Sequence, residues 1–272
     1  IVVISMVDAE ADLLQNLLWL MLMGLAIGVV IIVPVGHYLA KRAMVPIRES
    51  WGKQQQFVAD ASHELRTPIA GIYNNAELIM RNQDKTVAEE SKRIGAIMSE
   101  AKRLSKLIAG LLTLARADAG RGELNLRRLD IGELVETSAE AFQALEEFNQ
   151  VKVNINVDED IFINADEERL RQLMVIILDN AVKFTPPGGR VNVECRRADK
   201  GAIISVADSG IGIAAEDLPY IFDRFFRNDK ARTASGGTGL GLSIAKTIVE
   251  QHGGKLAVYS NQGEGTRVEV IL

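Results

Sequence analysis

The sequence has a single cysteine among its 272 residues, which excludes a disulfide framework and any cysteine-rich zinc site. It also lacks an excess of basic residues, because 31 lysines and arginines face 36 aspartates and glutamates. That balance argues against a protein that binds through a basic surface, so we expect no nucleic-acid partner. The cysteine, Cys195, alternates with polar neighbours in a strand-like run, and we expect an ordinary core thiol.

Charged residues are absent from residues 13–36, a run that is apolar almost throughout. Acidic residues precede this run, and Lys41, Arg42, Arg48 and Lys53 follow it. The length and composition predict a transmembrane helix over 13–36 in a lipid bilayer, and the positive-inside rule places all that follows in the cytoplasm. We expect residues 1–12 to be an extracytoplasmic remnant and any sensor region to precede the sequence given. The hydrophobic fraction of 47% provides for a packed core.

Residues 53–117 contain almost no strand signal, and their apolar residues recur at spacings of three and four, which predicts two helices. The second helix carries the longer seam: Ile94, Ile97, Ala101, Leu104, Ile108, Leu111 and Ala115. In the first helix the seam shifts register past Pro68, where we expect a bend. A turn near 82–86 makes the pair an antiparallel hairpin. A single hairpin leaves the apolar residues of its seam exposed to water, so we expect a homodimer in which two hairpins form a four-helix bundle.

His63 lies two positions after the seam residue Ala61 and points away from the seam. A lone exposed histidine is usually only a solvated residue, but this one stands in Ser62-His63-Glu64-Leu65-Arg66-Thr67-Pro68. A neutral imidazole is a nucleophile near pH 7, and an adjacent carboxylate can orient the ring and accept its proton. Thr67 follows by four positions and shares the same helical face.

The segment FVADASHELRTP (57–68) closely resembles the phosphoacceptor motif of sensor histidine kinases. The resemblance implies that His63 is the phosphorylated residue and Glu64 the general base. Thr67 matches the position that orients water for dephosphorylation of the response regulator.

From about residue 124 onward, short alternating runs replace the helical pattern. They predict strands over 151–157, 161–165, 190–196, 202–208, 255–260 and 266–272. Helical patterns lie near 131–148, 167–184 and 239–252. The mixture predicts an α/β sandwich, with one mixed sheet and helices on one face.

Glycines gather at 208–213, at 236–242 and at 263–266. The second cluster has the glycine spacing of a P-loop, but Leu242 stands where that loop requires lysine, so a Walker motif is rejected. The dinucleotide glycine spacing fails as well. What remains is a loop at a helix N-terminus whose amides can hold an anion.

The segment LDNAVKFT (178–185) resembles the asparagine box of the GHKL-type ATPases, and IFDRFFR (221–227) resembles the phenylalanine box of the histidine kinases. The resemblance covers about residues 41–272 and implies ATP and Mg²⁺. It assigns Asn180 to Mg²⁺, Lys183 to phosphate and Phe184 to the adenine pocket. The other ATP-site residues that it implies are Asp208 at the adenine amino group, Gly210 and Gly212 beside the base, Arg227 and Arg224 at the phosphates, the loop of Gly237, Thr238, Gly239, Leu240, Gly241 and Leu242, and a lid over 228–235.

One position departs from the family pattern, since Ile176 replaces a frequent second asparagine on the helical face of Asn180. We expect this change to modify nucleotide or metal binding without abolishing it.

The sequence is therefore interpreted as a sensor histidine kinase of a bacterial cytoplasmic membrane, with a response regulator as its partner. We expect a partial HAMP-like linker over 37–56, the phosphotransfer and dimerisation domain over 57–120 and the catalytic domain over 121–272. A GHKL ATPase that works as a mechanical clamp and a non-catalytic scaffold are the alternatives. The motif at His63 disfavours the first, and intact Asn180 and Asp208 disfavour the second.

Overall fold

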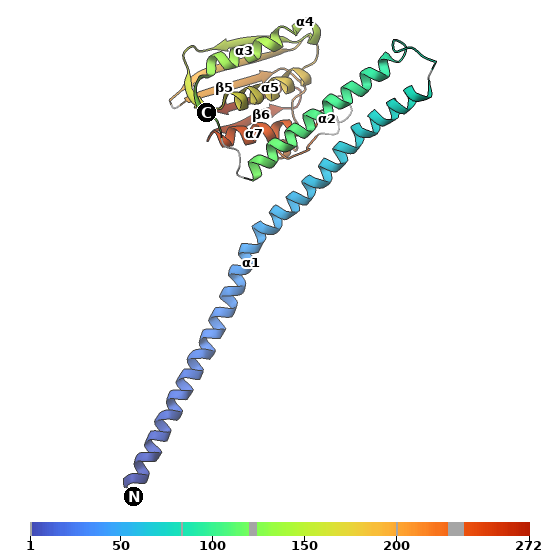
Figure 1. Ribbon diagram of the computed structural model, residues 1–272. Helices are drawn as coiled ribbons and strands as arrows, with labels where there is room; N and C mark the ends of the chain where they lie inside the picture. The colour runs from blue at the N-terminus through green and yellow to red at the C-terminus, as the bar shows by residue number, and fades with distance from the viewer. Residues whose placement is uncertain (1, 83, 120–123, 200, 228–236) are drawn as a thin grey trace. The chain divides into compact units, whose positions relative to one another are not determined.

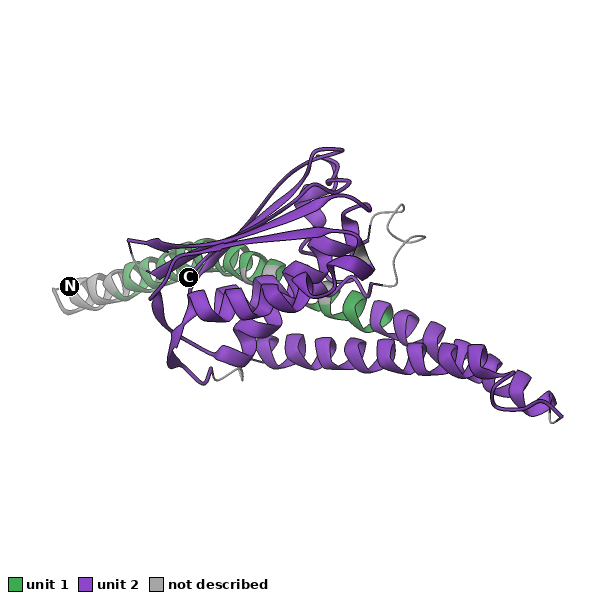
Figure 2. Cartoon of the chain, turned by 90° about the horizontal axis from the view of Figure 1, so that it is seen from above, with its two compact units in different colours: residues 1–59 green, residues 60–272 purple. Residues whose placement is uncertain are grey.

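The computed structural model describes residues 2–82, 84–119, 124–199, 201–227 and 237–272. The chain divides into two compact units, residues 1–59 and 60–272 (Figure 2). The boundary between them falls inside the first helix, α1, which runs from Val2 to Arg81.

The segment Leu14–Arg42 of α1 has a mean hydropathy of 2.7 and is long and apolar enough to cross a membrane. The span predicted over 13–36 and the linker predicted over 37–56 both lie within this one helix. The helix also continues through Pro46 and Pro68. Proline removes one backbone hydrogen bond, but its fixed φ is a helical value, so it need not end a helix.

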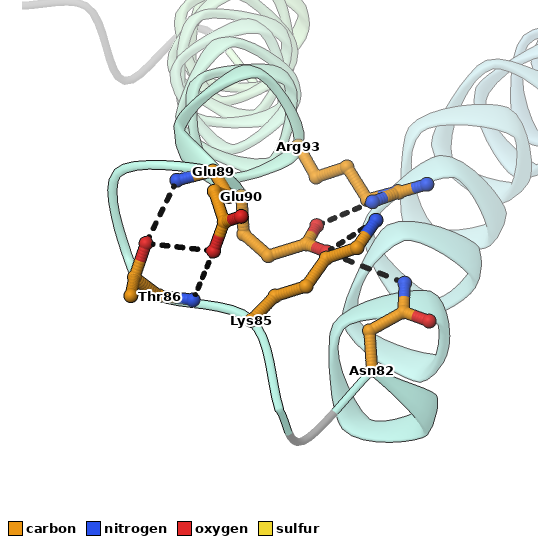
Figure 3. A network of polar contacts seen from close by, with 6 residues as sticks. All are labelled: Asn82, Lys85, Thr86, Glu89, Glu90 and Arg93. Atoms are coloured by element: carbon orange, nitrogen blue, oxygen red, sulfur yellow. Dashed lines mark hydrogen bonds and ion pairs between the residues drawn. The ribbon is translucent and has the colours of Figure 1, made fainter.

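The predicted hairpin is confirmed, because α1 is followed by a short turn and by α2 (Ser91–Asp118). Thr86 and Glu89 form a capping box, in which the Glu89 carboxylate accepts from the Thr86 backbone N–H at 2.7 Å and from its hydroxyl at 2.9 Å (Figure 3). Glu90 is only 3% exposed. Its carboxylate accepts from Arg93 and from Asn82 and lies 3.8 Å from the Lys85 ammonium, which satisfies a nearly buried charge.

The catalytic part contains a five-stranded mixed sheet in the order β2-β4-β5-β7-β6. Its strands are β2 (Lys152–Val157), β4 (Arg190–Ala198), β5 (Gly201–Asp208), β6 (Lys255–Asn261) and β7 (Gly265–Ile271). Only β2 and β4 are parallel; the other neighbours are antiparallel. Helices α3 (Ile131–Gln143), α5 (Glu167–Phe184) and α7 (Gly241–Gln251) lie on one face of this sheet (Figure 1). The predicted sandwich is confirmed.

The core forms between that sheet face and those three helices. Val191, Val193 and Cys195 alternate along β4 and are fully buried, as the period-two pattern requires. Burial raises the pKa of the Cys195 thiol to about 12, so it is the inert core thiol that the sequence predicted. Aspartates cap two of the helices: Asp130 accepts from the Gly132 N–H at 3.0 Å, and Asp166 accepts from the Arg169 N–H at 3.1 Å.

Two details differ from the expectation of one sheet and three long helices. The strand β3 (Phe162–Ala165) is not in the main sheet, because it pairs with an unanticipated strand, β1 (Arg127–Asp130), in a separate two-stranded sheet. The helix expected over 131–148 is interrupted after α3, and the short α4 (Glu146–Asn149) follows it. The left-handed Gln150 ends α4 and turns the chain into β2.

Candidate active site

The phosphoacceptor motif lies in the part of α1 that pairs with α2. The His63 side chain is exposed, as expected of a residue off the seam, whereas Pro68 is buried. The Thr67 hydroxyl donates a long, 3.5 Å hydrogen bond to the His63 carbonyl. Glu64 is partly buried, and its carboxylate lies 3.4 Å from the Arg103 guanidinium of α2. An accessible imidazole beside a partly enclosed carboxylate suits nucleophilic chemistry.

A cavity of about 380 Å³ opens in the catalytic part, which is a size suited to a small ligand. The sequence-predicted residues that line it are Asn180, Lys183, Phe184, Asp208, Gly212, Arg227, Gly237, Gly239 and Leu242. They come from the end of α5, the end of β5, the segments that follow β5 and precede α7, and the first turn of α7. Segments far apart in the sequence therefore converge on one pocket.

Asp208 is the last residue of β5 and presents its carboxylate to this cavity. Oδ1 accepts from the Gly210 N–H at 2.8 Å and from the Thr266 N–H at 3.1 Å, so the side chain is held in place. Burial raises the pKa of Asp208, and those two hydrogen bonds partly oppose the rise. A fixed, partly desolvated acceptor beside apolar walls is well suited to a flat heterocycle that carries an amino group.

Two glycines after Asp208 allow the backbone to pass close to the carbonyl groups of other segments. A Cβ on Gly210 would lie 2.4 Å from the Phe184 carbonyl oxygen. Gly212 has a φ of +64°, and a Cβ there would lie 2.0 Å from the Asn261 carbonyl oxygen. Both glycines are thus required by contacts within the protein. Gly212 lines the cavity, whereas Gly210 is not among its lining residues.

Positive charge gathers at the Lys183 end of the cavity. Partial burial lowers the pKa of Lys183, and Arg227, Lys106 and Arg103 lower it further, whereas Asp179 raises it. A Cβ on Gly237 would lie 2.9 Å from the Lys183 ammonium, so the backbone of this loop comes close to the charged end of that side chain. Anionic ligand groups bound here would relieve the mutual repulsion of these cations.

The loop before α7 contributes backbone more than side chains. Gly239 has a φ of +70°, and its carbonyl accepts from the Phe225 N–H at 2.9 Å. Leu240 is 1% exposed and serves the core. A Cβ on Gly241 would lie 3.3 Å from Ile176 and 3.8 Å from the Asn180 amide nitrogen. Ile176 and Asn180 therefore do share one face of α5, as the sequence argument required.

Arg224 is the candidate that the structure places elsewhere. It is not among the residues that line the cavity, and its guanidinium forms two bonds of 2.7 and 2.8 Å with the Asp118 carboxylate at the end of α2. Thr238, Leu240 and Gly241 also do not line the cavity. The lid expected over 228–235 lies outside the described residues.

Sequence reasoning missed several residues of the cavity wall: Ile211, Ile213, Ala214, Asp217, Phe226, Gln262 and Thr266. Thr266 had a signal, because it follows the third glycine cluster at the start of β7. Asp217 and Gln262 stand in loops with no pattern of their own, and only the fold brings them to the pocket.

Two family models match the chain. The model described as the His Kinase A (phospho-acceptor) domain matches residues 53–120. The model described as the histidine kinase-, DNA gyrase B- and HSP90-like ATPase matches residues 165–272. The sensor histidine kinase YkoH of Bacillus subtilis strain 168 is 41% identical over 82% of this chain and 48% of its own length. The chain spans about half the length of the curated relatives it matches.

Solved structures agree with the fold. Full-length ShkA in complex with AMPPNP is 32% identical, with a TM-score of 0.60, over 79% of this chain and 45% of the ShkA chain. The histidine kinase ThkA, in complex with the response regulator protein TrrA, is 24% identical with a TM-score of 0.63, over 82% of this chain and 62% of that one, and this likeness supports the fold alone. Since the two family models match in order and agree with the YkoH sequence, this chain belongs to the family of two-component sensor histidine kinases.

Proposed function

We propose that this protein transfers the γ-phosphoryl group of ATP to His63 and then to an aspartate of a response regulator. One observation carries the proposal. An exposed histidine with a carboxylate neighbour and a nucleotide-sized cavity with a fixed acceptor, Asp208, occur in one chain. The clamp ATPase and the scaffold have no specific observation in their favour.

His63 is the nucleophile. An imidazole nitrogen attacks the γ-phosphorus, the bond from that phosphorus to the bridging oxygen breaks, and ADP leaves with the electron pair. The imidazole proton passes to the Glu64 carboxylate and then to water. The catalytic part must carry the nucleotide to His63 for this step, and the lid expected over 228–235 would close over the phosphates.

The nucleotide is held by shape at one end and by charge at the other. Phe184, Ile211 and Ile213 line the cavity and would enclose the adenine, and the Asp208 carboxylate would accept a hydrogen bond from the adenine amino group through Oδ2. This contact favours adenine over guanine, which has an oxygen at the corresponding position. Lys183 and Arg227 face the phosphates. Gly237 and Gly239 present backbone to them.

Mg²⁺ fits the donors that are present. The described residues contain no group of three or more histidine, cysteine or carboxylate side chains that could hold a metal ion by itself. Asn180 lines the cavity and offers one amide oxygen. A magnesium ion bound mainly by phosphates and water needs few protein ligands, and Asn180 suffices as one of them. Bound there, the ion would neutralise phosphate charge.

The rest of the chain suits a dimeric membrane receptor of the cytoplasmic membrane. The predicted span over 13–36, which lies almost wholly within the apolar segment Leu14–Arg42, would cross the bilayer, with residues 1–12 outside and the linker over 37–56 inside. The domains over 57–120 and 121–272 would then face the cytoplasm. A second copy would cover apolar hairpin residues such as Met98, which is 68% exposed. On that bundle Thr67 would orient water against the regulator's phospho-aspartate.

The decisive experiment is labelling of purified, membrane-reconstituted protein with γ-labelled ATP and Mg²⁺. We expect acid-labile, alkali-stable label in the parent and none in His63→Gln, with nucleotide binding unchanged in that variant. His37→Gln is the control, because it removes a histidine that lies outside the motif, at the end of the apolar segment of α1. Label that survives in His63→Gln would defeat the assignment.

The same preparation tests the role of Thr67. Thr67→Ala should keep its label but slow the decay of the phospho-regulator. An unchanged decay rate would show that Thr67 does not orient water for dephosphorylation.

A further inference from the structure

A second face of α2 meets the catalytic part. Leu107 is 2% exposed and Leu114 is 1% exposed, although the other large apolar residues of the hairpin are half-buried or exposed. A Cβ on Gly110, between them, would lie 3.0 Å from Ile244 and 3.4 Å from Leu240. Arg103 precedes Leu107 by four positions, so it lies on the same face of α2, one turn beyond the covered residues.

Arg103 holds the carboxylate beside the phosphoacceptor. One guanidinium nitrogen lies 3.4 Å from Glu64 Oε2, and another lies 3.9 Å from Glu100 Oε2. Both distances exceed the 2.7–2.9 Å or so of a tight charge-assisted hydrogen bond. Arg103 is 25% exposed and Glu64 is 32% exposed, so water reaches the pair. The pair is weak and can be exchanged for a stronger one.

The Arg103 guanidinium also adds positive charge near Lys183, a residue that lines the nucleotide cavity. Arg103 and Lys106 are two of the cations that depress the pKa of Lys183 in the cavity wall. Arg103 thus pairs with the carboxylate beside His63, and it lies on the face of α2 where Gly110 approaches Leu240 and Ile244, next to the glycine loop of the pocket. Arginine is well suited to such a position, because its planar guanidinium group can donate two hydrogen bonds at once to the oxygens of either a carboxylate or a phosphate.

We propose that Arg103 is a further catalytic residue, which exchanges the Glu64 carboxylate for the γ-phosphate of ATP when transfer to His63 begins. The proposal rests on the proposed function. The exchange has two effects at once: it frees Glu64 to accept the imidazole proton, and it neutralises charge on the phosphoryl group as the bond to ADP breaks. No proton or electron is taken up by the guanidinium, which stays charged throughout.

The test compares Arg103→Gln and Arg103→Lys with the parent, in the full chain, at saturating ATP and Mg²⁺. We expect the labelling rate of Arg103→Gln to fall about 100-fold. Arg103→Lys should recover part of this loss, because it keeps the charge without the fork. Lys102→Gln is the matched control, since it removes an exposed cation from the next position of α2, and it should label at the parent rate.

Nucleotide affinity separates this role from a structural one. We expect Arg103→Gln to bind ATP about 5-fold more weakly than the parent, about 1 kcal/mol by conversion, with ADP affinity unchanged. Parallel loss of ATP and ADP affinity, or a lowered melting temperature that accounts for the slow labelling, would show that Arg103 only holds the hairpin together. Parent-like labelling by Arg103→Gln would end the proposal and leave His63 phosphorylation intact. The ATP-against-ADP comparison decides the γ-phosphate contact even if His63 takes no label.

Discussion

The catalytic part and the hairpin bury their apolar side chains very differently. In the described residues, nearly all apolar side chains that are at most 2% exposed lie between Ile131 and Val270. The hairpin contributes only Leu107 and Leu114, which flank Gly110 on the face of α2 where Gly110 approaches Ile244 and Leu240. By contrast, Tyr73 is 70% exposed and Met80 is 73% exposed on the hairpin.

This difference has a functional reason. A nucleotide pocket must hold its donors and acceptors at fixed positions, and a closed core of its own provides that rigidity. A phosphoacceptor must be accessible to a kinase domain, then to a regulator and then to water. An exposed helical surface provides that access. Apart from the γ-phosphate contact proposed for Arg103, nucleotide affinity should therefore be insensitive to changes in the hairpin, while phosphoryl transfer should respond to both parts.

The largest expected effect is at Asp208. Asp208→Asn keeps an oxygen for the Gly210 and Thr266 N–H groups but replaces the other oxygen, which would accept from adenine, with a donor. We expect ATP affinity to fall at least about 100-fold, near 3 kcal/mol, because two donors would then face each other. Fluorescent nucleotide displacement measures this loss. Dimer formation should not change, and a simultaneous loss of both would contradict the separation of the two parts.

The same substitution should also change stability with pH. Because burial raises the pKa of Asp208, the folded state holds this proton to higher pH than the unfolded chain does. The parent should therefore lose stability relative to Asp208→Asn as pH rises from the ordinary carboxyl range through that raised pKa. Melting curves of both proteins across acid to neutral pH, without nucleotide, test this. A melting difference that is constant with pH would contradict it.

A smaller effect is expected on the open side of the hairpin. Ile108 belongs to the predicted seam and is 45% exposed in the single chain. Ile108→Glu would place a charge in a dimer interface, and we expect the dimer dissociation constant to rise at least about 10-fold, or 1.4 kcal/mol. Sedimentation at several concentrations measures it, with ATP affinity as the property that stays constant. Lys92→Glu, an exposed change on the same helix, is the control.

Sequence patterns predicted the elements better than the contacts between them. Alternation found the strands of the main sheet, and the seam from Ile94 to Ala115 found α2, because both patterns are local and repeat. The second face of α2, at Leu107, Gly110 and Leu114, went unpredicted, since its apolar residues are few and one is a glycine. Likewise, nothing near Gly210 in the sequence shows that it passes against the Phe184 carbonyl.

Arg224 shows the same limit most clearly. Its place in the phenylalanine box implied a phosphate contact, yet its guanidinium pairs with Asp118, which lies more than a hundred positions earlier in the chain. Such a pair depends on how α2 packs against the catalytic part. Periodicity within a single helix carries no information about that packing.

The smallest expected effect is at this ion pair, where the two regions meet. The bonds are short and paired, but Arg224 is 31% exposed and Asp118 is 44% exposed, so water and salt screen the charges. We expect a coupling of about 0.5–1 kcal/mol, the upper part of the range for surface pairs. A double-mutant cycle with Asp118→Asn, Arg224→Gln and both together measures it, with amide hydrogen exchange in the last turns of α2 as the readout. Arg116→Gln removes a neighbouring exposed charge as the control. The coupling should shrink in 1 M salt. A value that does not respond to salt would show that packing at Gly110, and not this pair, holds the catalytic part against α2.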